Sequence, residues 1–150
     1  MTGDATSPQA LTPTAYAPED DSWGREGMEI SVALCAGRHE IVSNAGVTIT
    51  SAIFPQQVES PLDFETNERI AHDWVQAQSA FLDDKSWLGI HQKDGHRVEL
   101  HPPRLNLYVT GLTPCLTAFL VNWGMDQNAE LFLHHYDRDT GKYIAQYWCQ

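Results

Sequence analysis

Alternation of apolar and polar residues predicts the first strand of the chain over residues 28–35. Its apolar residues occupy every second position, and they are Met28, Ile30, Val32 and Leu34. Because side chains two apart lie on the same face of a strand, this pattern is typical of a half-buried strand. A β-branched stretch over residues 47–54 predicts a second strand, which Pro55 ends.

Spacings of three and four between apolar residues predict a helix after these two strands. Ser60 stands where an N-cap is expected, and Pro61 suits the first helical position. The apolar stripe that follows contains Ile70, Trp74, Ala77 and Phe81. A stripe of this kind is normally buried against a sheet, so we interpret Trp74 as a packing residue.

A hairpin, a strand and a second helix are predicted next. Asp94-Gly95 is a turn signal between two short stretches, which indicates a hairpin over residues 86–100. A strand over residues 105–109 follows it. The helix after that strand should begin with Thr113 as its N-cap, directly before a proline, and end at Gly124.

Two further strands, over residues 129–136 and 143–148, complete the pattern. Residues 105–136 should form a β-α-β crossover, in which the two strands are parallel. Two main helices packed on one mixed sheet give the simplest closure of these elements. We therefore expect an α/β fold, with α+β as the alternative.

The length of 150 residues indicates one domain. Residues 1–24 are rich in Thr, Ser, Pro, Ala and Asp without an apolar period, so we expect them to be a disordered acidic tail. Residues 25–150 would then form a single α/β domain. Neither a run of 18 apolar residues nor a secretory signal is present, so a cytoplasmic protein without membrane contact is expected.

The formal net charge of −11 makes duplex nucleic acid an unsuitable partner. Binding to duplex nucleic acid requires clustered lysine and arginine, and nine basic residues among twenty acids do not supply it. An acidic surface is compatible with plain solubility or with a basic protein partner. One hypothesis is therefore a non-enzymatic interaction protein, such as a phage or defence-system inhibitor or adaptor that binds a basic protein surface.

The first candidate site is the turn at Thr110, Gly111 and Thr113, between the strand over residues 105–109 and the next helix. Free backbone N–H groups in the first helical turn, together with threonine hydroxyls, can hold a phosphate. The alternative is an ordinary turn, in which Gly111 relaxes the backbone and Thr113 caps the helix. The glycine pattern of a dinucleotide or triphosphate loop is absent.

The second candidate site contains His134, His135, Asp137, Arg138 and Asp139. An imidazole can transfer protons, a carboxylate can orient a nucleophile, and an arginine can bind a phosphate with two hydrogen bonds. Adjacent histidines on a strand point to opposite faces, so at most one of the two belongs to a site. The alternative is that the aspartates shape a hairpin turn and Arg138 is solvated.

The cysteines and the remaining histidines give weaker signals. The three cysteines are widely spaced, form no Cys-x-x-Cys pair, and include Cys115, which we interpret as a buried structural thiol. The histidines and the glutamate of residues 91–101, namely His91, His96, Glu99 and His101, are a third candidate, for a metal site. The spacing that metal ligands require on one element is absent from this set.

The segment from residue 105 to the end resembles the small CRISPR-associated ring nucleases and their CARF-type relatives. In one such family a strand ends in Ser-Gly before a proline-initiated helix, and here Thr110-Gly111 and Pro114 stand in those places. The family's next strand ends in aromatic-Asp-Pro-Arg before a glycine hairpin, and here residues 136–141 read Tyr-Asp-Arg-Asp-Thr-Gly. The resemblance covers about 45 residues.

The resemblance implies a Rossmann-like fold that binds cyclic oligoadenylate, or another small phosphorylated ligand, as a homodimer or larger assembly. It places Asp137 and Arg138 in the active region, and cleavage of the ligand is a second expectation, with a divalent metal left open. The family also has a histidine before the second strand, where this chain has residues 125–128, Met-Asp-Gln-Asn. His134 is the candidate to replace it, and binding is the stronger expectation.

Overall fold

The computed structural model describes residues 8–16, 27–37, 39–55, 57–85, 87, 91–93, 96–98, 101–124 and 129–148, with the backbone alone for 91–93 and 96–98. It shows an α/β fold built on one mixed six-stranded sheet. The strands of this sheet are β1 (Thr14–Tyr16), β2 (Gly27–Cys35), β5 (Ala52–Phe54), β8 (Arg104–Tyr108), β9 (Glu130–Asp137) and β10 (Lys142–Tyr147).

The main sheet has the order β1-β2-β8-β9-β10, and β5 pairs with β2 as well. Strands β2, β8 and β9 are parallel neighbours, and β5 is parallel to β2. The first and last strands, β1 and β10, are antiparallel to their neighbours. The predicted parallel pairing of the two strands in the β-α-β unit is therefore confirmed.

Two small hairpins lie outside the main sheet. One consists of β3 (Ile41–Val42) and β4 (Thr48–Ile49), and the other of β6 (His91–Lys93) and β7 (His96–Val98). The hairpin predicted around Asp94-Gly95 is thereby confirmed. The single strand predicted over residues 47–54 is wrong, because the chain leaves β4 before Thr50 and joins the main sheet only at β5.

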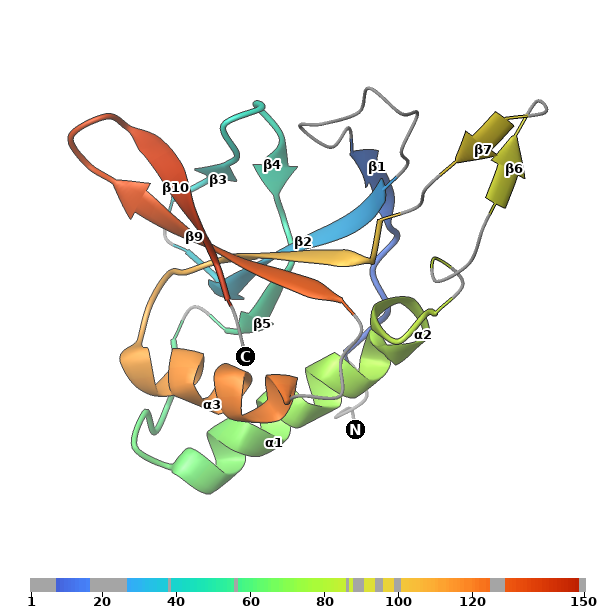
Figure 1. The fold of residues 1–150 in the computed structure, drawn as a ribbon. Helices are drawn as coiled ribbons and strands as arrows, with labels where there is room; N and C mark the ends of the chain where they lie inside the picture. Colours follow the sequence, from blue (N-terminus) through green and yellow to red (C-terminus); the bar gives the residue numbers. More distant parts are fainter. Residues whose placement is uncertain are drawn as a thin grey trace.

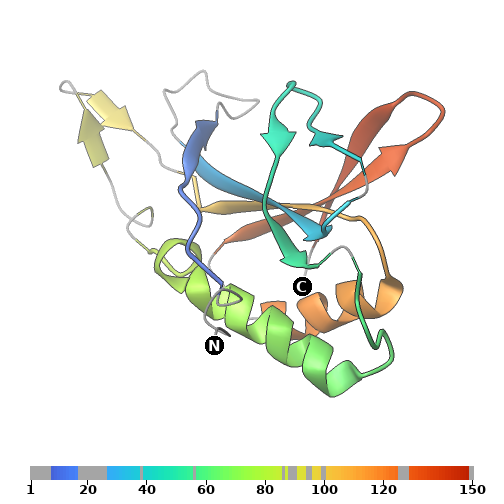
Figure 2. The same ribbon diagram turned by 180° about the vertical axis from the view of Figure 1, so that it is seen from behind.

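The helices in the described residues are α1 (Phe64–Ala77), α2 (Ser79–Leu82) and α3 (Thr113–Trp123). Both long helices pack on the same face of the sheet, which Figures 1 and 2 show from opposite sides. The rings of Trp74 and Phe119 meet between α1 and α3, and Trp123 is 2% exposed. The interpretation of Trp74 as a core residue is confirmed. None of these helices has the length and apolar character needed to span a bilayer.

Strand alternation gives the sheet two unlike faces. The helix-covered face consists of buried aliphatic side chains from three strands, namely Ile30, Val32, Leu34, Leu105, Leu107, Leu131 and Leu133. The intervening residues of the same strands point to the other side. We call this other side the open face, and in Figure 1 the β3–β4 and β9–β10 hairpins rise above it.

The N-terminal segment is ordered in part. Residues Thr14–Tyr16 form β1, and Leu11 packs against the main core. The buried side chain of Gln78 accepts a hydrogen bond from the Leu11 amide at 2.9 Å and donates one to the Gln9 carbonyl at 2.7 Å. The expectation of a disordered tail is therefore wrong for residues 8–16, while residues 1–7 and 17–26 lie outside the described residues.

The start of α1 also differs from the sequence prediction. The helix begins at Phe64, and its N-cap is Asp63, not Ser60. The Asp63 carboxylate accepts hydrogen bonds from the amide of Thr66 at 3.2 Å and from its hydroxyl at 2.7 Å. These bonds, together with the positive end of the helix dipole, favour an aspartate at this position.

Replacement of this cap tests the assignment. The hydrogen bonds from Thr66 hold the pKa of Asp63 below its ordinary value, so the cap stabilises the folded state fully above the ordinary carboxyl pKa. We expect Asp63→Ala to lower the urea midpoint at pH 7, and this deficit to shrink as the pH falls through the lowered pKa. The matched variant Ser60→Ala should leave the midpoint unchanged; an equal loss in both variants would contradict the assignment.

Candidate functional site

Thr110 and Gly111 follow β8 and contact the end of the neighbouring parallel strand β2. The Thr110 hydroxyl donates to the Cys35 carbonyl at 2.7 Å and accepts from the Cys35 amide at 3.2 Å. Gly111 has φ of +88°, and a Cβ on it would lie 2.7 Å from Cys35 Sγ. Both residues therefore contact the end of β2 at Cys35. The positive φ of Gly111 agrees with the ordinary-turn interpretation, whereas the hydrogen bonds of Thr110 to Cys35 were not predicted.

The amino end of α3 offers few donors to an anion. The N-cap is Leu112, and Thr113 is the first helical residue, so the prediction that Thr113 caps the helix is wrong. Pro114 carries no N–H group, and the amides of Cys115 and Leu116 both donate to the Leu112 carbonyl. Of the groups that usually hold a phosphate at a helix start, most are absent or already bonded here.

Asp137 shapes the turn between β9 and β10. Its carboxylate accepts hydrogen bonds from the Asp139 amide and from the Thr140 hydroxyl, both at 3.0 Å. Arg138 and Asp139 are exposed in this turn. Within the described part of the chain, no hydrogen bond or ion pair joins this turn to Thr110 or Thr113, so the two predicted groups remain separate.

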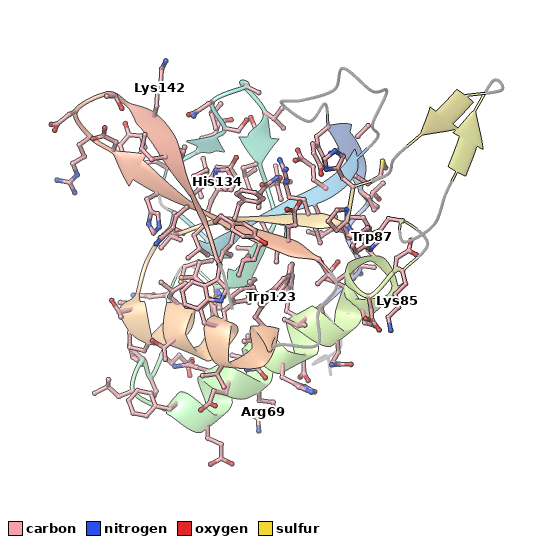
Figure 3. The ribbon with its side chains drawn as sticks, viewed as in Figure 1. Arg69, Lys85, Trp87, Trp123, His134 and Lys142 are labelled. Carbon is pink, nitrogen blue, oxygen red and sulfur yellow. The ribbon has the colours of Figure 1, made fainter. Side chains whose placement is uncertain are left out.

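The two adjacent histidines point to opposite faces of the sheet, as expected. His135 Nε2 lies 2.8 Å from Gln146 Oε1. His134 Nε2 lies on the open face, 3.0 Å from Asn106 Oδ1. Figure 3 shows His134 above the sheet and Trp123 below it. Of the residues predicted for the second site, His134 is the one that the structure connects to a wider polar network.

This network runs across three strands of the open face. The Asn106 amide nitrogen donates to Glu29 Oε1 at 3.0 Å and to Ser31 Oγ at 3.3 Å, while its oxygen faces His134. A carboxylate only accepts hydrogen bonds, which fixes the orientation of the Asn106 amide. His134 must then donate from Nε2, so its Nδ1 carries a lone pair. Asn106 is 7% exposed, and all its side-chain hydrogen-bonding groups are used.

Burial controls the charge of His134. Desolvation, with a contribution from the positive charge of Arg104, lowers the pKa of His134 to about 4. The imidazole is therefore neutral at pH 7. Its ring is stacked on that of Tyr108, with centroids 4.6 Å apart, and burial and the Glu29 carboxylate raise the pKa of that tyrosine.

A pocket of about 370 Å³ lies between the open face and the β3–β4 hairpin. Strands β2 and β8 contribute Glu29, Ile30, Ser31 and Tyr108. The other walls come from the N-terminal segment with β1, from the β3–β4 hairpin and from the residues that follow it, in particular Thr12, Thr14, Ser43, Thr48, Thr50 and Ser51. Small-ligand sites usually have volumes of roughly 300–1,000 Å³. The pocket therefore has the size of a site for a small molecule and a lining rich in hydroxyl groups.

The Asn44 side chain fixes the β3–β4 hairpin above this pocket. It donates to the Tyr143 carbonyl at 2.8 Å and accepts from the Tyr143 amide at 2.9 Å. The Tyr143 ring in turn contacts Tyr108, with centroids 4.9 Å apart. The β3–β4 hairpin, which covers the pocket, is thus attached to β10 by residues 99 positions apart in the sequence.

Arg104 is the basic residue of the open face among the described strand residues. Its guanidinium carbon lies 4.1 Å from the ring centroid of Tyr16 and 4.4 Å from that of Phe132. A nitrogen of the same group lies 3.8 Å from Glu130. Arg104 does not line the pocket, and its charge is engaged by aromatic rings and a carboxylate.

The structure also bears on Cys115 and on the histidines considered as metal ligands. Cys115 is fully buried, as expected, and burial beside Cys35 raises its pKa to about 12, so the thiolate is strongly disfavoured. Among the residues that the structure describes, no cluster of three metal-ligating side chains occurs. The side chains of His91 and His96, Glu99, and residues 125–128 lie outside the described residues.

Sequence reasoning did not identify Glu29, Ser31, Asn106 and Tyr108 as site residues. Strand alternation placed Glu29 and Ser31 together on the polar side of the first strand, which was a usable signal. The partner strand was not readable, because the network joins residues 75 and 77 positions apart.

Comparisons with protein-family models, with curated proteins and with solved structures found no match for this chain.

The contact between Gly111 and Cys35 predicts a difference between two glycines of similar conformation. Gly46 has φ of +85° but nothing within 4 Å of an added Cβ. In both alanine variants the left-handed backbone lowers the free energy of unfolding by about 1–2 kcal/mol. We expect Gly111→Ala to be clearly less stable than Gly46→Ala, because only the former also forces Cys35 away. Equal unfolding free energies in urea would contradict the described contact.

The lowered pKa of His134 predicts a pH effect on stability. Between pH 6.5 and pH 4 the unfolded chain gains a proton at this residue and the folded chain does not, so stability falls as the pH is lowered. We expect His134→Gln to flatten this part of the profile of unfolding midpoint against pH. Ring NMR should show a neutral, Nε2-protonated His134 at pH 6; titration near pH 6.5 would contradict the burial argument.

Proposed function

We propose that this protein is a binding module for a small nucleotide-type ligand, with a cyclic oligoadenylate as the specific candidate. The observation that carries the proposal is the hydrogen-bond network in which Glu29 and Ser31 line the pocket and Asn106 and His134 hold them from behind. Its fixed donors and acceptors are of the kind that orient a polar ligand. The resemblance of the C-terminal segment to CRISPR-associated ring nucleases supports the choice of ligand.

The environment of the network supports a ligand with a planar ring. Tyr108 lines the pocket, and it belongs to an aromatic group that continues through Tyr143 to Tyr136. Tyr108 is 5% exposed and has one face on His134, so it offers a base only a partial contact, and the exposed Tyr136 is the ring of this group that is free to stack. Stacking of a tyrosine on a nucleobase contributes about 1–3 kcal/mol per base in other proteins. Tyr136 is 56% exposed, so this aromatic group reaches from Tyr108 to the solvent.

Binding is better supported than cleavage. A general acid or base acts most efficiently when its pKa is near the working pH, and the pKa of His134 is about 4. Its Nε2 proton is used by Asn106, and the Asp137 carboxylate is used by the turn. A neutral, hydrogen-bonded imidazole instead positions Asn106, and through it Glu29 and Ser31.

A ligand panel tests this function. We expect cyclic tri-, tetra- or hexa-adenylate to raise the melting temperature of the purified chain, and the ligand to be recovered intact by chromatography. The variant Asn106→Leu should lose the shift because Glu29 and Ser31 lose their common donor. As a control, Asn122→Leu removes an amide of α3, which bonds to Glu68 and Ala118 away from the pocket.

Two outcomes would contradict the proposal. If no cyclic oligoadenylate raises the melting temperature, these compounds are not the ligand. The alternative, an acidic protein that binds a basic protein surface, would then be favoured. Rapid linearisation of the ligand by the wild type, abolished by His134→Gln, would show that the open face is catalytic.

A further inference from the structure

We propose that the pocket takes the base of the ligand, with the amino group of the base on Glu29, and that phosphate groups stay outside the pocket. This inference deepens the proposed function and rests on it. It assigns Glu29 the role of a specificity-determining residue.

The charges in the pocket favour this assignment. Apart from Tyr108, Glu29 is the titratable residue of its lining, and no lysine, arginine or histidine contributes to the described walls. The neighbouring Arg104 is held between two aromatic rings and beside Glu130. A phosphate would therefore meet a carboxylate without a compensating cation, which is unfavourable.

The hydrogen-bonding capacity of the walls points to a ligand group with N–H donors. Asn106 occupies one acceptor site of the Glu29 carboxylate, which has about four in total. Ser31 accepts from Asn106, and a hydroxyl that accepts one hydrogen bond still has a proton with which it can donate to a ligand acceptor. A carboxylate beside a hydroxyl donor matches an amino group beside a ring nitrogen, as on the edge of adenine.

The geometry of the network keeps the Glu29 carboxylate in place. Glu29 and Ser31 lie two positions apart on β2, so both face the pocket, and a single Asn106 nitrogen holds them. His134 contacts Asn106 from β9, and its ring is stacked on that of Tyr108. Glu29→Gln is nearly isosteric and keeps an oxygen for Asn106, but it turns an N–H₂ group toward the pocket.

The experiment is an NMR titration of the full chain with adenosine, purine riboside (which lacks the amino group), guanosine and inorganic phosphate, followed at the amides of Glu29, Ser31 and Tyr108. We expect adenosine to bind about 10- to 100-fold more tightly than purine riboside, the effect of one charge-assisted hydrogen bond. Phosphate should not shift these amides. Glu29→Gln should abolish the preference for adenosine.

Glu130→Gln is the matched control, because it removes the same charge from the same face without altering the pocket lining. It should keep the preference for adenosine. Equal binding of adenosine and purine riboside, no shift with any nucleoside, or an unchanged preference in Glu29→Gln would overturn the inference.

The result also separates this inference from the proposed function. If cyclic oligoadenylate stabilises the protein but Glu29→Gln retains the preference for adenosine, the function stands and the role of Glu29 fails. If guanosine binds more tightly than adenosine and requires Glu29, donor recognition by Glu29 stands and the oligoadenylate ligand fails.

Discussion

The open face is organised by the need to satisfy a buried amide in the middle of the sheet. Asn106 lies on the central parallel strand β8, where an unpaired polar group would cost about 1–3 kcal/mol. Glu29, Ser31 and His134, from the two flanking strands, together complete its hydrogen bonds. These partners also form or support the pocket wall. The same residues therefore complete the hydrogen bonds of Asn106 and determine the shape of the pocket.

This constraint arises because the helices cover only one face of the sheet. Parallel strands in α/β proteins are usually covered on both faces and are apolar throughout. Here β2 and β8 alternate aliphatic residues toward α1 and α3 with polar or aromatic residues on the other side. The β3–β4 hairpin covers part of that side, held by Asn44 on Tyr143, and leaves a pocket beneath it.

Periodicity in the sequence predicted β2, β8, β9 and β10, while a turn signal and a helix-stop glycine predicted the β6–β7 hairpin and the end of α3 at Gly124. Predictions failed where competing local signals were similar. Asp63 caps α1 in place of Ser60 because Thr66 supplies two donors, and at α3 the cap position is held by Leu112, with Thr113 already inside the helix. The network of Asn106 depends on strand order, which local patterns do not contain.

The acidity of the chain and the chemistry of the pocket both require a ligand whose binding does not depend on attraction to its phosphate groups. With a net charge of −11 and no cation in the described pocket lining, attraction to phosphate contributes little to affinity. Binding must then come from directed hydrogen bonds and from contact with the ring of Tyr108, both of which act over short range. Salt screens these contacts far less than it screens exposed charge pairs, so affinity for a base in this pocket should depend only weakly on ionic strength.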